Sequence, residues 1–78
     1  MKVYPKACIK LYQANGVYKV QSCMVWLDNG VARLLGSGEN YKSTEAAIGE
    51  MKRRTMNLLR ERGRPETGHD VNWEIVSD

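Results

Sequence analysis

The sequence predicts an α+β fold: a three-stranded antiparallel meander, one long helix packed on one sheet face, and a fourth C-terminal strand (β-β-β-α-β). Two Asn-Gly dipeptides, Asn15-Gly16 and Asn29-Gly30, lie fourteen residues apart between runs that alternate apolar and polar residues. Asn-Gly favours tight hairpin turns because both central residues of such a turn need positive φ. Residues 43–62 then have the apolar spacing of a helix, and residues 71–76 alternate again, which is typical of a strand.

The length and composition of the chain predict one small domain, residues 1–78. The 78 residues leave room for a single thin core, since small domains bury a modest share of their surface. Hydrophobic residues make up 42% and charged residues 27%, as in ordinary globular proteins. No run approaches the roughly 20 apolar residues of a membrane helix, and residues 1–6 lack the apolar stretch of a signal peptide. We therefore expect a cytoplasmic protein with no membrane contact.

The first hairpin is expected to join strands at about residues 3–13 and 17–27. A two-residue turn at Asn15-Gly16 pairs Ala14 with Val17. If the two strands pair residue by residue in a regular ladder away from this turn, every side chain is assigned to one of the two sheet faces. One face, toward the helix, receives Ile9, Leu11, Val20, Met24 and Trp26. The opposite, open face receives Tyr4, Lys6, Cys8, Lys10, Tyr12, Lys19, Gln21, Cys23, Val25 and Leu27.

The same regular ladder places Cys8 directly opposite Cys23. Facing Cα atoms lie about 4.5–5.5 Å apart, within the range that a disulfide accepts. A cytoplasmic compartment keeps thiols reduced, so we expect two free thiols on the open face. Pro5 has no backbone donor, and the start of the first strand should therefore lie at a sheet edge or outside the ladder.

The second hairpin, which leads into a third strand at about residues 31–36, has two alternative turns. A two-residue turn at Asn29-Gly30 places Arg33 beside Trp26 on the helix-facing side. A three-residue loop at residues 28–30, with Gly30 in a bulge, turns Arg33 outward and places Ala32 and Leu34 toward the helix instead. We expect the second alternative because it buries no arginine.

The helix is expected at about residues 43–62, after Gly36-Ser37-Gly38 has ended the third strand. Ser43 or Thr44 provides the N-terminal cap, and the first turn is acidic, which suits the positive end of the helix dipole. The buried stripe consists of Ala47, Ile48, Met51, Thr55, Leu58 and Leu59. Gly63 is a natural C-terminal cap, and Pro65 prevents continuation.

The fourth strand, at about residues 71–76, turns Trp73 and Ile75 toward the helix. One helix can cover one face of a single sheet. The other face is then bare unless a partner covers it.

Part of the chain resembles the strand-strand-helix half of double-stranded-RNA-binding domains. The resemblance spans about residues 17–59 and rests on Gly36 and Gly38, on Lys42, and on the Ala46-Ala47 pair that opens the helix. That family grips phosphates with a lysine cluster at the helix start, of which only Lys42 remains here. The family's first helix is absent and a C-terminal strand is added, so the resemblance implies shared topology rather than membership. The run at residues 44–47 after a short sheet is also similar to HicB-like antitoxin domains.

The sequence contains no recognisable catalytic or metal-binding motif, and we expect no enzyme activity. Histidine occurs once, as His69 beside Asp70, and adjacent residues of an extended segment point in opposite directions. No Ser or Cys lies in a nucleophile motif, and two cysteines with one distant histidine are fewer than the four ligands of structural zinc. Gly36-Ser37-Gly38 lacks the rest of a phosphate-binding pattern. We therefore expect no cofactor, metal or small-molecule substrate.

Two surfaces are candidates for binding. The residues proposed for the sheet face are Tyr4, Lys6, Lys10, Tyr12, Lys19, Val25 and Leu27. Its apolar end, to which Val31 and Leu35 belong, is typical of a protein interface, whereas aromatics between lysines suit single-stranded nucleic acid. The alternative surface is the helix cluster Lys52, Arg53, Arg54 and Arg60. The competing interpretation of this cluster is an ordinary solvated helix face with no binding role.

The charge of the chain is unevenly distributed. Residues 1–64 carry twelve Lys and Arg against five Asp and Glu, a net of +7, whereas residues 65–78 carry four acids and no Lys or Arg, a net of −4. A basic body invites an anionic partner. We expect a non-enzymatic binding protein, such as a bacterial or phage accessory protein that forms a homodimer or docks on a larger protein partner through the open sheet face or edge. The alternative is a nucleic-acid-binding protein.

Overall fold

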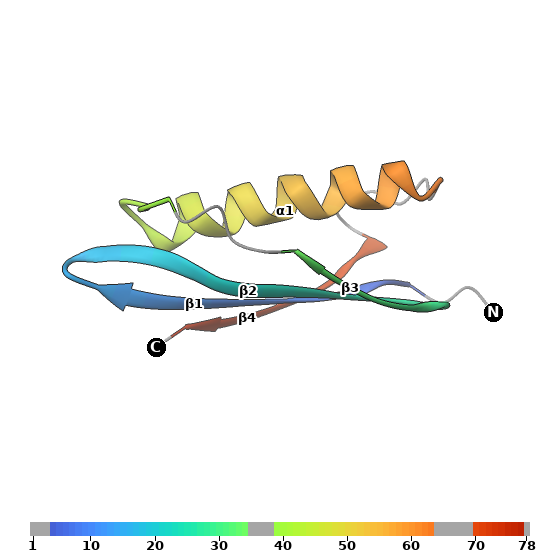
Figure 1. Cartoon of the computed structure of the whole chain (residues 1–78), viewed down its shortest axis with the longest axis horizontal. Coiled ribbons are helices and arrows are strands. Elements are labelled where there is room, and N and C mark those ends of the chain that lie inside the picture. Colours follow the sequence, from blue (N-terminus) through green and yellow to red (C-terminus); the bar gives the residue numbers. More distant parts are fainter. Residues whose placement is uncertain (1–3, 35–38, 64–69, 78) are drawn as a thin grey trace.

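A computed structural model describes residues 4–34, 39–63 and 70–77 of the chain. One helix lies across one face of a four-stranded sheet (Figure 1), as the sequence predicts. The elements are β1 (Lys6–Ala14), β2 (Val17–Leu27), β3 (Gly30–Leu34), α1 (Thr44–Glu61) and β4 (Asn72–Ser77). The strand order in the sheet is β3-β2-β1-β4, in which β1, β2 and β3 form the antiparallel meander and β4 pairs with β1 in parallel.

The first turn confirms the Asn-Gly prediction. Asn15 (φ 53°) and Gly16 (φ 79°) both have positive φ, and Ala14 pairs with Val17 on either side of them. Pro5 precedes β1 and lies outside the β1–β2 ladder. Its carbonyl still has a structural role, because it accepts the Asn72 N–H at 2.9 Å and so marks the start of the β1–β4 pairing.

The regular ladder predicted for the whole first hairpin is wrong beyond its first four pairs. Leu11 pairs with Val20 but Lys10 pairs with Ser22, so Gln21 is an extra residue that faces no partner on β1. This is a β-bulge, in which two residues of one strand oppose one of the other. All later pairs are shifted by one residue relative to the prediction, and Ile9 rather than Cys8 lies opposite Cys23.

The bulge reverses the two faces in the second half of β2. Cys23 and Val25, predicted on the open face, pack with Ile9 in the core and are fully buried. Leu27 also packs against the core and is partly buried. Met24 and Trp26, predicted toward the helix, lie on the opposite face. The physical reason is that side chains alternate between the two faces along a strand, so one extra residue exchanges the faces of all the residues that follow it.

The second turn differs from both predicted alternatives: it has two residues, like the first alternative, but lies one position earlier, and the expected three-residue loop is wrong. Its two loop residues are Asp28 and Asn29, and Gly30 (φ 147°) is already paired with Leu27. A positive φ at this position favours glycine. Arg33 pairs with Met24 and therefore lies on the open side, which confirms its predicted outward direction. Leu35 and Gly36-Ser37-Gly38 lie outside the described residues.

Helix α1 has the caps that the sequence indicates. The Ser43 hydroxyl accepts the Ala46 N–H at 3.2 Å at the N-terminus. At the C-terminus Gly63 has φ 71° and donates its N–H to the Arg60 carbonyl at 3.0 Å. Tyr18 and Tyr41 exchange two backbone hydrogen bonds, of 3.0 and 2.9 Å, which tie the segment before the helix to the start of β2. Pro65 lies outside the described ranges.

The core lies between α1 and the two central strands. The predicted helix stripe is confirmed, with Ala47, Met51, Thr55 and Leu59 fully buried and Ile48 and Leu58 partly buried. The core residues of the sheet are Ala7, Ile9 and Leu11 of β1 with Cys23 and Val25 of β2, and Val71 joins them. In β4, Trp73 and Ile75 share the helix-facing side with Ala7 and Ile9, as predicted, but Ile75 remains 40% exposed because α1 packs over β1 and β2.

No helix in the described part of the chain has both the length and the apolar character that a membrane crossing needs.

Candidate functional site

The open face is the side of the sheet that α1 does not cover (Figure 1). Its residues follow from the strand registers, because paired residues share a face and successive residues alternate. They are Lys6, Cys8, Lys10 and Tyr12 of β1; Lys19, Ser22, Met24 and Trp26 of β2; Val31 and Arg33 of β3; and Asn72, Glu74 and Val76 of β4. Within the described residues no other element lies over this surface.

The most organised part of the open face is a contact that spans three strands. The Lys6 ammonium lies 5.5 Å from the centroid of the Trp26 ring and 3.0 Å from the Glu74 carboxylate. The cation is thus shared between an aromatic face, which attracts it electrostatically, and an acid. The side chains of Lys6 and Glu74 are 53% and 50% exposed, and ion pairs of that exposure contribute little to stability. Lys6 can therefore exchange Glu74 for another anion at low cost.

The open face has an apolar end and a basic end. At one end Trp26 pairs across the strands with Val31, and these side chains are 38% and 53% exposed. At the other end, toward the Asn15-Gly16 turn, Lys19 pairs with Tyr12. Among the described residues of the face, four cations (Lys6, Lys10, Lys19 and Arg33) stand against one acid, Glu74. Such a surface attracts anionic groups.

The structure keeps some of the predicted sheet-face residues together and removes others. Lys6, Lys10, Tyr12 and Lys19 share the open face, and Tyr4, just before β1, is 47% exposed. The placement of Val25 and Leu27 is wrong, since both belong to the helix side. Sequence reasoning placed Trp26 on the wrong face, and it turned Arg33 outward without including it among the candidate site residues.

One sequence signal could have revealed the bulge. A regular ladder would place Ser22 toward the helix, opposite Ile9, and a hydroxyl on a buried face needs a hydrogen-bond partner. Treating Gln21 as the extra residue moves Ser22 to the open face and places Cys23 opposite Ile9. That change also moves Trp26 onto the open face, where it is exposed.

The two cysteines lie on opposite faces of the sheet, so the predicted cross-strand pair is wrong. Both are free and buried, Cys8 opposite Met24 and Cys23 opposite Ile9. The Cys23 Sγ lies 3.7 Å from the Thr55 Oγ1, and burial raises the pKa of the Cys23 thiol, with a smaller opposing effect of the Thr55 contact. Cys23 is therefore a protonated core residue rather than a reactive group.

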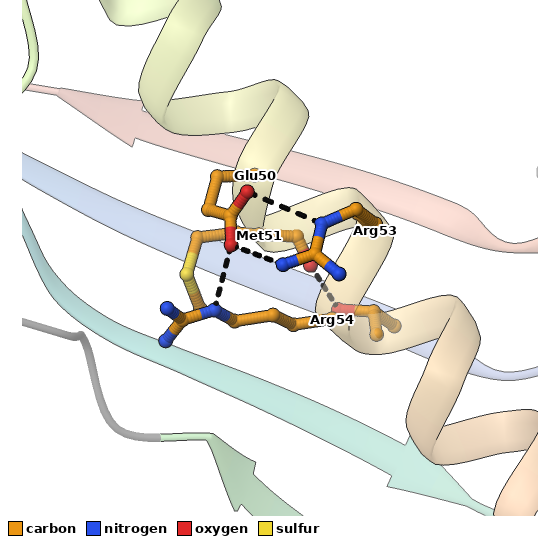
Figure 2. A network of polar contacts seen from close by, with 5 residues as sticks. Glu50, Met51, Arg53 and Arg54 are labelled. Atoms are coloured by element: carbon orange, nitrogen blue, oxygen red, sulfur yellow. Dashed lines mark hydrogen bonds and ion pairs between the residues drawn. The ribbon is translucent and has the colours of Figure 1, made fainter.

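The basic helix cluster is held by contacts within the helix and by one contact with β4. Figure 2 shows the Glu50 carboxylate between Arg53 and Arg54. The carboxylate lies 2.6 Å from the Arg53 guanidinium and 3.0 Å from the Arg54 guanidinium. The hydrogen bonds from Arg53 and then Arg54 lower the pKa of the Glu50 carboxyl. Lys52 lies 5.2 Å from the Trp73 ring centroid, and Arg60 is exposed in the last turn. Three of the four predicted helix residues are thus engaged locally, and they do not converge on one anion site.

A polar depression of about 460 Å³ lies between the β2–β3 turn and the end of α1. It is lined by Leu27, Asp28, Asn29 and Arg62. No three His, Cys, Asp or Glu side chains gather as metal ligands in residues 4–34, 39–63 and 70–77. His69 lies outside these ranges.

Comparisons with protein families, with curated proteins and with solved structures found no match to this chain.

Proposed function

We propose that the chain is a protein-binding module that docks an acidic protein partner on its open face. The observation that carries the proposal is the position of Trp26, which is 38% exposed on a sheet face that no other described element covers and where, among the described residues, four cations oppose one acid. An exposed tryptophan on such a face is a natural anchor for a partner, because binding energy at interfaces concentrates on a few Trp, Tyr and Arg residues.

The composition of the open face supports a protein partner. Aromatic residues, Met and Arg are enriched at protein interfaces, whereas Lys belongs to the rim. Trp26, Met24 and Arg33 lie close together on β2 and β3, and the lysines lie on β1 and on the basic half of β2. Docking would bury Trp26 and release the Lys6 cation from Glu74 to an acid of the partner.

The charge of the open face favours a different protein over a second copy of the same face. Two copies packed face to face would bring Lys10, Lys19 and Arg33 against their own counterparts, and like charges across an interface cost several kcal/mol. An acidic surface instead complements these cations and accelerates the encounter at low salt.

The test is affinity capture followed by calorimetry with the purified partner. The bait is the wild-type chain, the Trp26→Ala variant, and as a matched control Gln13→Ala, an exposed residue on the helix side of the same hairpin. We expect Trp26→Ala to weaken binding at least about tenfold, Gln13→Ala to leave it unchanged, and salt to weaken it. A partner that binds Trp26→Ala as tightly as wild type would refute the role of the open face.

A second candidate function, binding of single-stranded nucleic acid, is supported by one observation. Tyr12 and Trp26 lie on the same face as Lys10, Lys19 and Arg33, and bases stack on aromatics while cations follow the phosphates. Fluorescence titration with single-stranded oligonucleotides at two salt concentrations tests it. Binding should weaken steeply as salt rises and weaken further in a Lys10→Glu, Lys19→Glu double variant. Absence of binding at low salt removes this candidate.

A further inference from the structure

The outer edge of β4 has free backbone pairing capacity. Among the described strands, β4 pairs only with β1, and its other side has no neighbour. The Asn72 N–H bonds to the Pro5 carbonyl on the β1 side. Because backbone groups alternate in direction along a strand, Asn72, Glu74 and Val76 bond toward β1, and the N–H and C=O of Ile75 and Ser77 are directed outward.

The two edges of the sheet differ in protection. Sheet edges are usually protected by short strands, charged residues, proline or bulges. The β3 edge is five residues long, begins at Gly30 and carries Arg33. The β4 edge has fewer of these devices: its register with β1 is regular over six residues, its one charged residue is Glu74, which lies 3.0 Å from Lys6, and it contains neither Lys, Arg nor Pro. Its two β-branched apolar residues, Ile75 and Val76, lie on opposite faces and are each 40% exposed.

We infer that β4 pairs with β4 of a second copy of this chain, antiparallel about a two-fold axis at Ile75, to form one continuous sheet of two chains. In this register Ile75 meets the partner's Ile75, and Glu74 meets the partner's Val76. The occupant is a second copy because the strand is complementary to itself: both apolar residues become covered at once, on their respective faces.

Charge selects this register over its neighbours. An axis at Glu74 would set that carboxylate directly against the partner's Glu74, and like charges in a cross-strand pair are destabilising. An axis at Val76 would place Ile75 opposite the partner's Ser77, so that the apolar side chain of Ile75 would face a polar one. With the axis at Ile75, Glu74 instead lies between its own Lys6, at 3.0 Å, and the partner's Lys10, which is the β1 neighbour of Val76 on the same face.

The inference goes beyond the proposed function: Trp26 lies on β2, which β1 separates from β4, and the two share only the Lys6–Glu74 contact. Its test is sedimentation of the full chain up to millimolar concentration. Wild type should pass from monomer to dimer as concentration rises. Ile75→Lys and Ile75→Glu should each raise the dissociation constant at least about tenfold, because two like charges meet at the axis. The control Val31→Lys, on the β3 edge, should dimerise as wild type, and circular dichroism should show all variants folded.

An equimolar mixture of Ile75→Lys and Ile75→Glu provides the register-specific measurement. The opposite charges then face each other at the axis, so the mixture should dimerise where neither variant does alone. A wild-type chain that stays monomeric at the highest concentration overturns the inference. It is equally overturned if Val31→Lys abolishes the dimer, or if the mixture shows no rescue.

Discussion

Deletion of Gln21 tests the bulge that sets the two faces of β2. In the structure Gln21 is exposed and has no partner on β1. Without it, Val20 and Ser22 become consecutive residues and pair with Leu11 and Lys10 in a regular ladder. All pairs before and after the deletion keep their partners, so we expect a folded protein.

The expected size of the effect follows from what stays buried. Cys23 and Val25 are fully buried and keep the helix side after the deletion, so the free energy of unfolding should change by about 1 kcal/mol or less. If β2 instead formed the regular ladder that the sequence predicts, the deletion would reverse its faces. Met24 and Trp26, which that ladder places toward the helix, would then be exposed; exposing Met24 alone would cost about 1.5–3 kcal/mol.

Deletion of Lys19 is the matched control in the same strand. It moves Val20 to the open face and places Gln21 opposite Leu11, which is 2% exposed. Burying an unpaired amide costs about 1–3 kcal/mol, so this variant should be clearly less stable than the Gln21 deletion. Urea unfolding followed by circular dichroism measures both. A Gln21 deletion that unfolds the chain, or that costs as much as the Lys19 deletion, would contradict the bulge.

The remaining predictions concern the helix and the core. Met51→Ala should lower the free energy of unfolding by about 2–5 kcal/mol in urea titrations, because the side chain is fully buried between helix and sheet. Arg53 and Arg54 lower the folded-state pKa of Glu50, so the stability that Glu50 contributes is present at neutral pH and is lost as the pH falls through the carboxyl range. The melting temperature of Glu50→Gln should therefore fall less on acidification than that of wild type. The folded-state pKa of Cys23 is raised by burial, so stability should fall as the pH rises above the ordinary thiol value of about 8.5, and Cys23→Ala should have a flatter profile in unfolding titrations over that range.

Most of the fold could be predicted because local signals agreed with one another. The Asn15-Gly16 turn has a conformation that few other residue pairs adopt. The helix has Ser43 as its N-cap, Gly63 with positive φ directly after the C-cap Arg62, and a single apolar stripe. Its expected bounds, residues 43–62, differ by one residue at each end from Thr44–Glu61.

The part that could not be predicted depends on an ambiguity in β2. Residues 23–27 are all apolar, so either alternate set fits a core face, and periodicity alone cannot choose between them. A bulge at an ordinary polar residue such as Gln21 has no turn signal of its own. The candidate site therefore kept Lys19, which precedes the bulge when counted from the turn, and Lys10, which lies on β1, the strand without the extra residue. It lost Val25, which follows the bulge on β2.

The parallel pairing of β4 with β1 has a consequence for the order in which the sheet forms and opens. β1, β2 and β3 are joined by tight turns, whereas β4 reaches β1 only after the helix has crossed the sheet. Pairing between segments far apart in sequence closes late in folding, since the entropy of the intervening chain is lost first. The amide hydrogens of Glu74 and Val76 should therefore exchange with solvent before those of β1 and β2, through a local opening that leaves the meander and α1 intact.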